Sequence, residues 1–306
     1  MLSRDAEHFY WLSRYVERAE NTARILNVNV ELMLDFPGDK SSMWKPLIEI
    51  TGMEKVFIEK YQEFDEINSV KFLSDDKENP NSILSSLIMA QYNARPIRNN
   101  LPRSSAEQLN LILKDFINDM ASTKSRSRRT NNIYEVISKS QLFFGIISDN
   151  FLRGTEYQFI KLGRFIERAD MISRIIDQQC LRDTSTLGEN FPTLQWASIL
   201  RSMSAYESFR MFSQGDISQK EVLNFLIKNK DYGRSISSCL YNVENSINNL
   251  PRNTPIKSEI KNLHNRIQKA RLEKYSDMKI HDFIDLLQRK LLLIDELIDK
   301  SYFHNN

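Results

Sequence analysis

The chain has 306 residues, of which 41% are apolar and 27% charged, a balance typical of a globular protein with a buried core. It contains only eight glycines and eight prolines, which argues against a turn-rich all-β fold and against a long disordered linker. The 42 basic and 40 acidic residues give a net charge of +2. We therefore do not expect a general binder of nucleic acid or of membrane surfaces.

Cysteine usage and the N-terminus indicate a cytoplasmic protein. The two cysteines, Cys180 and Cys239, cannot form a disulfide framework, and two free thiols suit a reducing compartment. No apolar run reaches the ~18 residues of a membrane span. Arg4, Asp5 and Glu7 occupy positions where a signal peptide needs its apolar stretch.

Apolar residues at helical spacing dominate the chain, and we expect an all-α fold, a bundle of about twelve helices. No segment alternates apolar and polar residues as a half-buried strand would. Ser218 and Glu221 match a capping box at the start of a helix. The first helix is expected over residues 9–34, ending before Pro37-Gly38, and the second from near Trp44, with Pro46 in its first turn. A further helix is expected between Asn79-Pro80 and Leu101-Pro102, followed by helices over residues 105–120 and 133–149 and a long one that ends at Cys180. Helices are also expected after Phe191-Pro192 and over residues 282–298.

An internal repeat is the strongest feature of the sequence. Residues 12–26 read LSRYVERAENTARIL and residues 162–176 read LGRFIERADMISRII, with seven of fifteen positions identical. The string NNLPR also occurs twice, at residues 99–103 and 248–252. Agreement of this kind at an offset that stays near 150 residues indicates a duplication. We therefore expect one compact domain, residues 1–306, made of two related helical halves, about 1–150 and 151–306, around an approximate two-fold axis.

Both repeats carry the pattern R-x-x-E-R-A-[DE]-x-x-x-R on a predicted helix. The first two arginines are four residues apart, so they lie on one side of the helix and repel each other unless an anion lies between them. The acidic residue after Ala and the last arginine have the i,i+4 spacing of an ordinary helix ion pair. The pattern comprises Arg14, Glu17, Arg18, Glu20 and Arg24 in the first copy and Arg164, Glu167, Arg168, Asp170 and Arg174 in the second.

Two interpretations of these charges stay open. In the first, the glutamate of each copy pairs with an arginine of the other copy in an internal network. Glu17 then pairs with Arg164 or Arg168, and Glu167 with Arg14 or Arg18. In the second, the arginines line a cleft for a carboxylate or phosphate, which guanidinium groups bind through paired hydrogen bonds.

The segment MLSRDAEHFYWLSRYVERAENTARIL resembles the N-terminal signature of the bacterial alpha-E family, a helical domain without an assigned reaction. Residues 152–177, with LGRFIERAD, resemble the second signature of that family. QYNAR at residues 91–95 resembles its Glu-Asn-Ala-Arg motif, with Tyr92 where the family usually has Glu and with Asn93 and Arg95 matching. The resemblance covers essentially the whole chain.

The resemblance implies a partner role. The family is typically found with circularly permuted ATP-grasp ligases, transglutaminase-like peptidases and a proteasome-related peptidase. The resemblance therefore implies that this chain takes part in making or processing a peptide or amide modification. The candidate binding residues for an acidic peptide, or another carboxylate or phosphate ligand, are Arg14, Arg18, Asn21, Arg24, Arg164, Arg168, Arg174, Asn93 and Arg95.

Three functions stay open, and with them the question of whether the chain is an enzyme. The first is a partner that binds an acidic peptide beside an ATP-grasp ligase. The second is a stand-alone acyl or peptidyl transferase, in which Glu17 or Glu167 is a general base and the arginines stabilise developing negative charge. The third is a non-catalytic helical scaffold.

No metal or cofactor is expected. The four histidines are scattered, and the sequence contains no HExxH, ExxH or CxxC pattern. It contains no glycine-rich phosphate loop, so a nucleotide would have to bind on a partner. The basic segment KSRSRR at residues 124–129 is interpreted as a solvated loop before a helix at Ile133, because no aromatic side chains interleave it.

Overall fold

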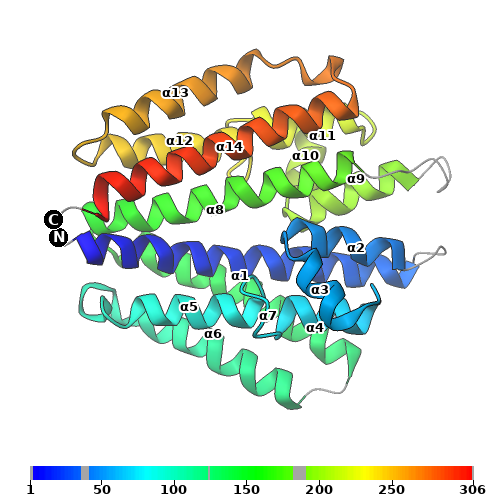
Figure 1. Cartoon of the computed structure of the whole chain (residues 1–306), viewed down its shortest axis with the longest axis horizontal. Helices are drawn as coiled ribbons and strands as arrows, with labels where there is room; N and C mark the ends of the chain where they lie inside the picture. Colours follow the sequence, from blue (N-terminus) through cyan, green and yellow to red (C-terminus); the bar gives the residue numbers. More distant parts are fainter. Residues whose placement is uncertain (1–2, 36–40, 123–124, 182–190, 305–306) are drawn as a thin grey trace. The chain divides into compact units, whose positions relative to one another are not determined.

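The computed structural model describes residues 3–35, 41–122, 125–181 and 191–304 (Figure 1). Within these ranges the chain forms fourteen α-helices, two short 3-10 segments and one π-helical segment, and no β-strand. The all-α class predicted from the sequence is confirmed, with more helices than expected because several are short.

Residue contacts divide the chain into two compact units, residues 1–164 and residues 165–306. Helix α8 (Thr155–Cys180) crosses this boundary, so its first ten residues belong to the first unit. The arrangement of two halves around a two-fold axis stays a prediction.

In the first unit, α1 is the central helix and packs against α5 and α7, while α6 packs against both of these helices (Figure 1). The apolar face predicted for α1 is fully buried, at Phe9, Leu12, Val16, Ala19, Ala23 and Leu26. The elements of this unit are α1 (Ser3–Asp35), α2 (Ser41–Ile50), α3 (Glu54–Tyr61), α4 (Glu66–Ser74), α5 (Ile83–Ala94), η1 (Arg98–Asn100), α6 (Arg103–Ser122), α7 (Arg126–Asn150) and the start of α8.

In the second unit, α13 packs against both α12 and α14. The long α14 buries a stripe of apolar residues spaced three or four apart, Ile280, Ile284, Leu287, Leu291, Ile294 and Ile298, as an amphipathic helix must. The elements are the rest of α8, α9 (Phe191–Ser202), α10 (Tyr206–Phe212), α11 (Gln219–Leu223), the π-helical η2 (Asn224–Lys228), α12 (Ile236–Asn248), α13 (Thr254–Lys269), η3 (Leu272–Lys274) and α14 (Asp277–Tyr302).

Some predicted helix starts are wrong. Helix α7 begins at Arg126, so this arginine lies in the first turn of a helix and not in a solvated loop. Its Nε atom lies 2.8 Å from Glu66 Oε1, and its Nη2 atom donates to the carbonyl oxygen of Val30 at 3.5 Å, which anchors the turn. Lys124, at the start of the basic segment, lies outside the described residues.

Of the predictions for a proline and for a helix cap, the structure contradicts the first and confirms the second. Pro46 lies beyond the first turn of α2, because that helix begins at Ser41 and not near Trp44. The Ser218 side chain accepts the backbone N–H of Glu221 at 3.4 Å, so this cap is confirmed. Pro37 and Gly38 lie outside the described residues, and α1 ends at Asp35.

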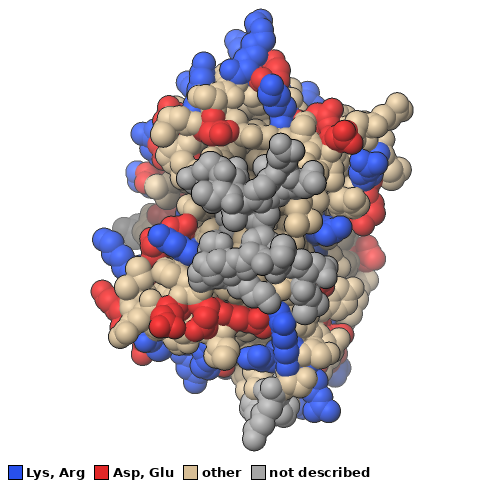
Figure 2. Space-filling model, turned by 90° about the vertical axis from the view of Figure 1, so that its right-hand side faces the viewer, with Lys and Arg blue, Asp and Glu red and all other residues tan. Residues whose placement is uncertain are grey.

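The surface mixes charges of both signs. Figure 2 shows basic and acidic side chains interspersed over one face, in keeping with the near-zero net charge of the chain. Among the described residues no helix is long and apolar enough to cross a bilayer.

Candidate functional site

The first ER motif lies on a helix that is buried on its polar side as well as on its apolar side. Arg14 is 8% exposed, Glu17 and Glu20 are 0% exposed, and Arg24 is 6% exposed. Asn21, one turn after Glu17, is also buried. Charged groups withdrawn from water in this way need partners, because an isolated buried charge is very costly.

Glu17 accepts a hydrogen bond from Arg164 Nε at 3.3 Å. The guanidinium carbon of Arg164 lies 3.8 Å from the ring centroid of Phe144, so the cation also packs on an aromatic face. Both groups lie in the first unit, where the start of α8 meets α1. The structure thus brings the first arginine of the second motif to the glutamate of the first motif, as the network interpretation expects.

Glu20 and Arg24 form a buried pair along α1. The Nε and Nη2 atoms of Arg24 both donate to Glu20 Oε1, at 2.9 and 2.7 Å. Charge-assisted hydrogen bonds of this length are among the strong ones. The i,i+4 pairing predicted from the sequence is confirmed, and its burial makes it more than a surface ion pair.

Arg14 and Arg18 are held by aromatic rings and by neutral oxygen atoms. Arg14 lies 5.0 Å from the ring centroid of Trp11 and donates to the hydroxyl oxygen of Tyr10 at 3.4 Å. Arg18 lies 5.3 Å from the ring centroid of Tyr15. These cation–π contacts orient both guanidinium groups on the same side of α1.

Arg18 is also tied to the loop between α4 and α5. It donates from Nη1 to Asn81 Oδ1 at 3.2 Å, while the amide nitrogen of Asn81 donates to the carbonyl of Thr51 at 3.1 Å. The backbone N–H of Asn81 donates to the side chain of Asn79 at 2.9 Å, and fully buried Asn79 donates to the Phe72 carbonyl at 2.9 Å. Asn81 therefore reaches Arg18 from a rigidly bonded loop.

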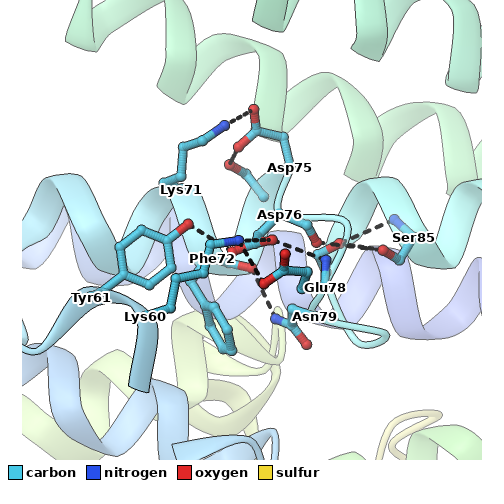
Figure 3. Close-up of polar contacts among 11 residues, drawn as sticks. Lys60, Tyr61, Lys71, Phe72, Asp75, Asp76, Glu78, Asn79 and Ser85 are labelled. Carbon is cyan, nitrogen blue, oxygen red and sulfur yellow. Dashed lines mark hydrogen bonds and ion pairs between the residues drawn. The ribbon is translucent and has the colours of Figure 1, made fainter. Parts of the chain in front are cut away.

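Buried Asp76 anchors the same loop (Figure 3). Its carboxylate accepts from Tyr61 Oη at 2.7 Å, from Lys60 Nζ at 2.9 Å and from the backbone N–H of Glu78 at 3.0 Å. Burial opposes the charged form, but the hydrogen bonds from Tyr61 and Lys60 outweigh it and lower the pKa of Asp76. Burial and the bond to Asp76 raise the pKa of Tyr61 to about 12, so this phenol stays a donor at neutral pH.

Sequence reasoning missed Asn81, Asn79 and Asp76. The signal was present as the run SDDKENPNS at residues 74–82, which is rich in the Asp, Asn, Ser and Pro residues that bond to their own backbone in turns. Such a run indicates a turn, but it does not indicate which distant side chain the turn contacts.

The second ER motif is buried at its centre and more open at its end. Glu167 and Arg168 are 2% and 5% exposed, and the guanidinium of Arg168 lies 5.4 Å from the ring centroid of Phe165. Arg174 Nε donates to Asp170 Oδ2 at 2.9 Å, which confirms the predicted i,i+4 pair. The Arg174 side chain is 41% exposed, in contrast to buried Arg24.

Asn93 and Arg95, from the third motif, have different surroundings. Asn93 is buried, its Oδ1 atom lies 3.0 Å from His8 Nδ1, and its amide donates to the Met89 carbonyl at 2.8 Å. Arg95 is exposed and donates to Gln91 at 3.3 Å, along its own helix end. Asn93 therefore joins α5 to the start of α1, whereas Arg95 is a surface residue.

Beyond the second motif, α8 carries an ion pair to α14. His281 Nδ1 lies 2.7 Å from Asp177 Oδ1. The hydrogen bond to Asp177 raises the pKa of His281 against the opposing effect of burial, and the nearby charges of Asp282 and Asp285 add to the rise.

We expect the His281→Gln substitution to destabilise the protein more at about pH 5.5 than at about pH 9. The folded-state pKa of His281 lies above the unfolded value of about 6.5, so its stabilisation is complete below that value and is lost as pH rises through the folded pKa. Urea unfolding at both pH values measures the difference. His304→Gln is the control, because the pair of His304 with Asp299 is exposed. Equal losses for His281→Gln at both pH values would contradict the assignment.

The burial of Glu17 bears on the alternative in which this residue is a general base. General-base catalysis needs a carboxylate that can reach the substrate, whereas Glu17 is fully buried and bonded to Arg164. Among the described residues, no three His, Cys, Asp or Glu side chains gather as metal ligands would.

The fold and the site together define the class of this protein: a helical domain with buried charges around a repeated Glu-Arg dipeptide. The model of the Alpha-E family, described as a predicted alpha-helical domain with a conserved ER motif, matches residues 1–303. The chain belongs to the Alpha-E family, and its two ER dipeptides are Glu17-Arg18 and Glu167-Arg168. No curated protein and no solved structure matches the chain.

Proposed function

We propose that this Alpha-E chain is a non-catalytic partner of an ATP-grasp ligase and binds an acidic peptide through the arginines of its ER motifs. The observation that supports this role is that two guanidinium groups near buried Glu17 stay partly exposed: Arg18 is half-buried, and the Arg164 side chain is 24% exposed while Glu17 is 0% exposed. Buried ion pairs add little net stability compared with apolar side chains of similar volume. A purely structural helix would therefore gain little from this motif, whereas a binding site needs oriented cations.

In this proposal the glutamates orient the arginines. Glu17 holds Arg164, and Asn81 with the Tyr15 ring holds Arg18. A guanidinium fixed in this way binds a carboxylate or phosphate through two parallel hydrogen bonds with little loss of side-chain freedom. Glu167 has the corresponding orienting role in the second motif, and a transglutaminase-like peptidase would process the modified peptide.

The Arg14→Lys variant tests the binding role. Lysine keeps the charge but loses the planar guanidinium, so the affinity for a hexaglutamate peptide should fall at least about tenfold with little change in melting temperature. Calorimetry with hexaglutamate and with neutral hexaglutamine measures this. Arg103→Lys is the control, because Arg103 is exposed and pairs with Glu107 along its own helix. Unchanged hexaglutamate affinity in Arg14→Lys would contradict the binding role.

The Arg14→Ala variant distinguishes a ligand site from a scaffold. A loss of about 3–5 kcal/mol in the free energy of unfolding, with no peptide binding by the parent chain, would favour an internal network without a ligand. Abolished binding with a nearly unchanged melting temperature would support the ligand site.

The ligase partnership has its own test. The chain is co-expressed with an ATP-grasp ligase from the same genome, and both complex formation and ligase output are measured. A complex that forms reproducibly, or a change in ligase output, supports the proposal. The absence of both would overturn the partnership while leaving the peptide-binding role open to the Arg14 variants.

We also propose that the two ER helices derive from an internal duplication, with halves related by an approximate two-fold axis. Ser13 and Gly163 are equivalent positions in the repeat, and a Cβ atom on Gly163 would lie 2.3 Å from Ser13 Oγ. Contact between equivalent positions is what a two-fold axis between two helices produces. This contact lies within the first unit and supports the duplication.

A further inference from the structure

A pocket of about 590 Å³ lies in the second unit, between the antiparallel helices α13 and α14. This volume is in the range of small-molecule sites. Its wall combines cations, carboxamides and aromatic rings.

The cations come mainly from the last turns of α13. Arg266 and Lys269 line the pocket and are exposed. Among the described residues neither of them forms an ion pair with an acidic side chain. The third cation, Lys290 of α14, pairs with Glu259 at 3.0 Å. Two positive charges of this wall therefore have no acidic partner in the described part of the chain, which favours an anionic ligand.

The aromatic rings come from Phe283, in the second turn of α14, and from Tyr275, which directly follows η3. Tyr275 and Phe283 meet edge to face with their ring centroids 6.2 Å apart, and both are half-buried. Lys279 Nζ lies 4.5 Å from the Tyr275 centroid. Phe283 and Lys290 are seven residues apart on one side of α14, so their positions on the helix are separated by about 10 Å along its axis.

The carboxamides of Asn262 and Asn265 lie on the same wall as Arg266. Each carboxamide offers donors and an acceptor, which is the pattern that reads the edge of a nucleobase or a ribose hydroxyl. Flat rings at one end, carboxamides along the wall and unpaired cations are the three parts that a nucleoside phosphate needs. Inorganic phosphate would leave the rings unused, and a nucleic acid would need a longer basic track than a chain of net charge +2 provides.

We propose that this pocket binds a free nucleoside phosphate. The base packs on Tyr275 and Phe283, the carboxamides bond to the base or the ribose, and the phosphates are held by Arg266 and Lys269. This proposal replaces the expectation from the sequence that a nucleotide binds only on a partner. Without a glycine-rich loop, side-chain cations supply the phosphate contacts, so binding should weaken as salt is raised. This inference is independent of the peptide-binding role of the ER motifs.

The probes are ADP, AMP, adenosine, inorganic phosphate and a single-stranded oligonucleotide, with binding measured by calorimetry at low salt. ADP should bind at least about tenfold more tightly than adenosine or inorganic phosphate. The double variant R266Q/K269Q should lose at least about tenfold in ADP affinity, and Tyr275→Ala should lose a similar factor. Tyr275→Phe, which keeps the ring, should retain binding. Lys261→Gln is the matched control, an exposed lysine of the same helix that does not line the pocket.

Several outcomes would overturn the proposal. One is a lowered melting temperature of R266Q/K269Q with unchanged ADP affinity. The two cations would then only stabilise the negatively polarised C-terminal end of α13. A second is inorganic phosphate binding as tightly as ADP. A third is an oligonucleotide that binds more tightly than ADP and competes with it, which would make the surface a nucleic-acid contact.

Discussion

Replacing Gly163 by alanine is expected to lower the free energy of unfolding by about 3 kcal/mol. A Cβ atom at this position would lie 2.2 Å from the carbonyl oxygen of Tyr10 and 2.3 Å from Ser13 Oγ. The hydroxyl of Ser13 can rotate away, but the carbonyl of Tyr10 belongs to the backbone of α1. The two backbones would therefore have to separate, which disturbs the packing around Glu17 and Arg164. Urea unfolding followed by circular dichroism measures the loss.

The matched control is Gly145→Ala on α7. Gly145 is exposed, and a Cβ atom there would meet nothing within 4 Å. Alanine at this helical position should raise the free energy of unfolding by about 0.5–1 kcal/mol, because glycine is the poorer helix former. If both glycine variants shifted stability in the same direction, the close approach of α1 and α8 at Gly163 would be wrong.

The second large effect is expected from Arg164→Ala. Removing this arginine takes a partner from Glu17, a carboxylate that is 0% exposed, and a loss of about 3 kcal/mol in the free energy of unfolding should follow. Glu17→Gln should cost less, about 1 kcal/mol, because a carboxamide oxygen still accepts from Arg164 and the partly exposed guanidinium can be hydrated.

Arg103→Ala provides the scale for this comparison. Arg103 and Glu107 form an exposed i,i+4 pair, and its removal should cost the least of the three, because water replaces the lost contact. Chemical denaturation of the three variants at neutral pH gives the order of the losses. A loss for Arg164→Ala as small as that for Arg103→Ala would mean that Glu17 does not depend on Arg164, and the orienting role of Glu17 would lose its support.

Local patterns in the sequence predicted the local parts of the site correctly. The pairs Glu20–Arg24 and Asp170–Arg174 follow from helix geometry alone, because residues four apart are neighbours on any α-helix. The cap at Ser218 depends on spacing in the same way. Exact helix starts were harder, as at Arg126, because a side-chain contact with Glu66 stabilises a turn that its own sequence leaves open.

Contacts between residues far apart in the chain could not be predicted in this way. One of the two interpretations of the repeat was that Glu17 meets Arg164 or Arg168, and the structure places it against Arg164. No pattern indicated that Asn81 would bond to Arg18, since sequence spacing carries no information on how a loop packs against a helix 63 residues away.

The amino-acid sequence by itself determined the all-helical class, the membership of the Alpha-E family and the two charged motifs, because these depend on periodicity and on residue identity. Only the tertiary structure decided that the polar side of α1 is buried. Periodicity divides a helix into an apolar and a polar face, but burial of the polar face depends on partners such as Arg164 that reach it from elsewhere in the chain and make withdrawal of its charges from water tolerable.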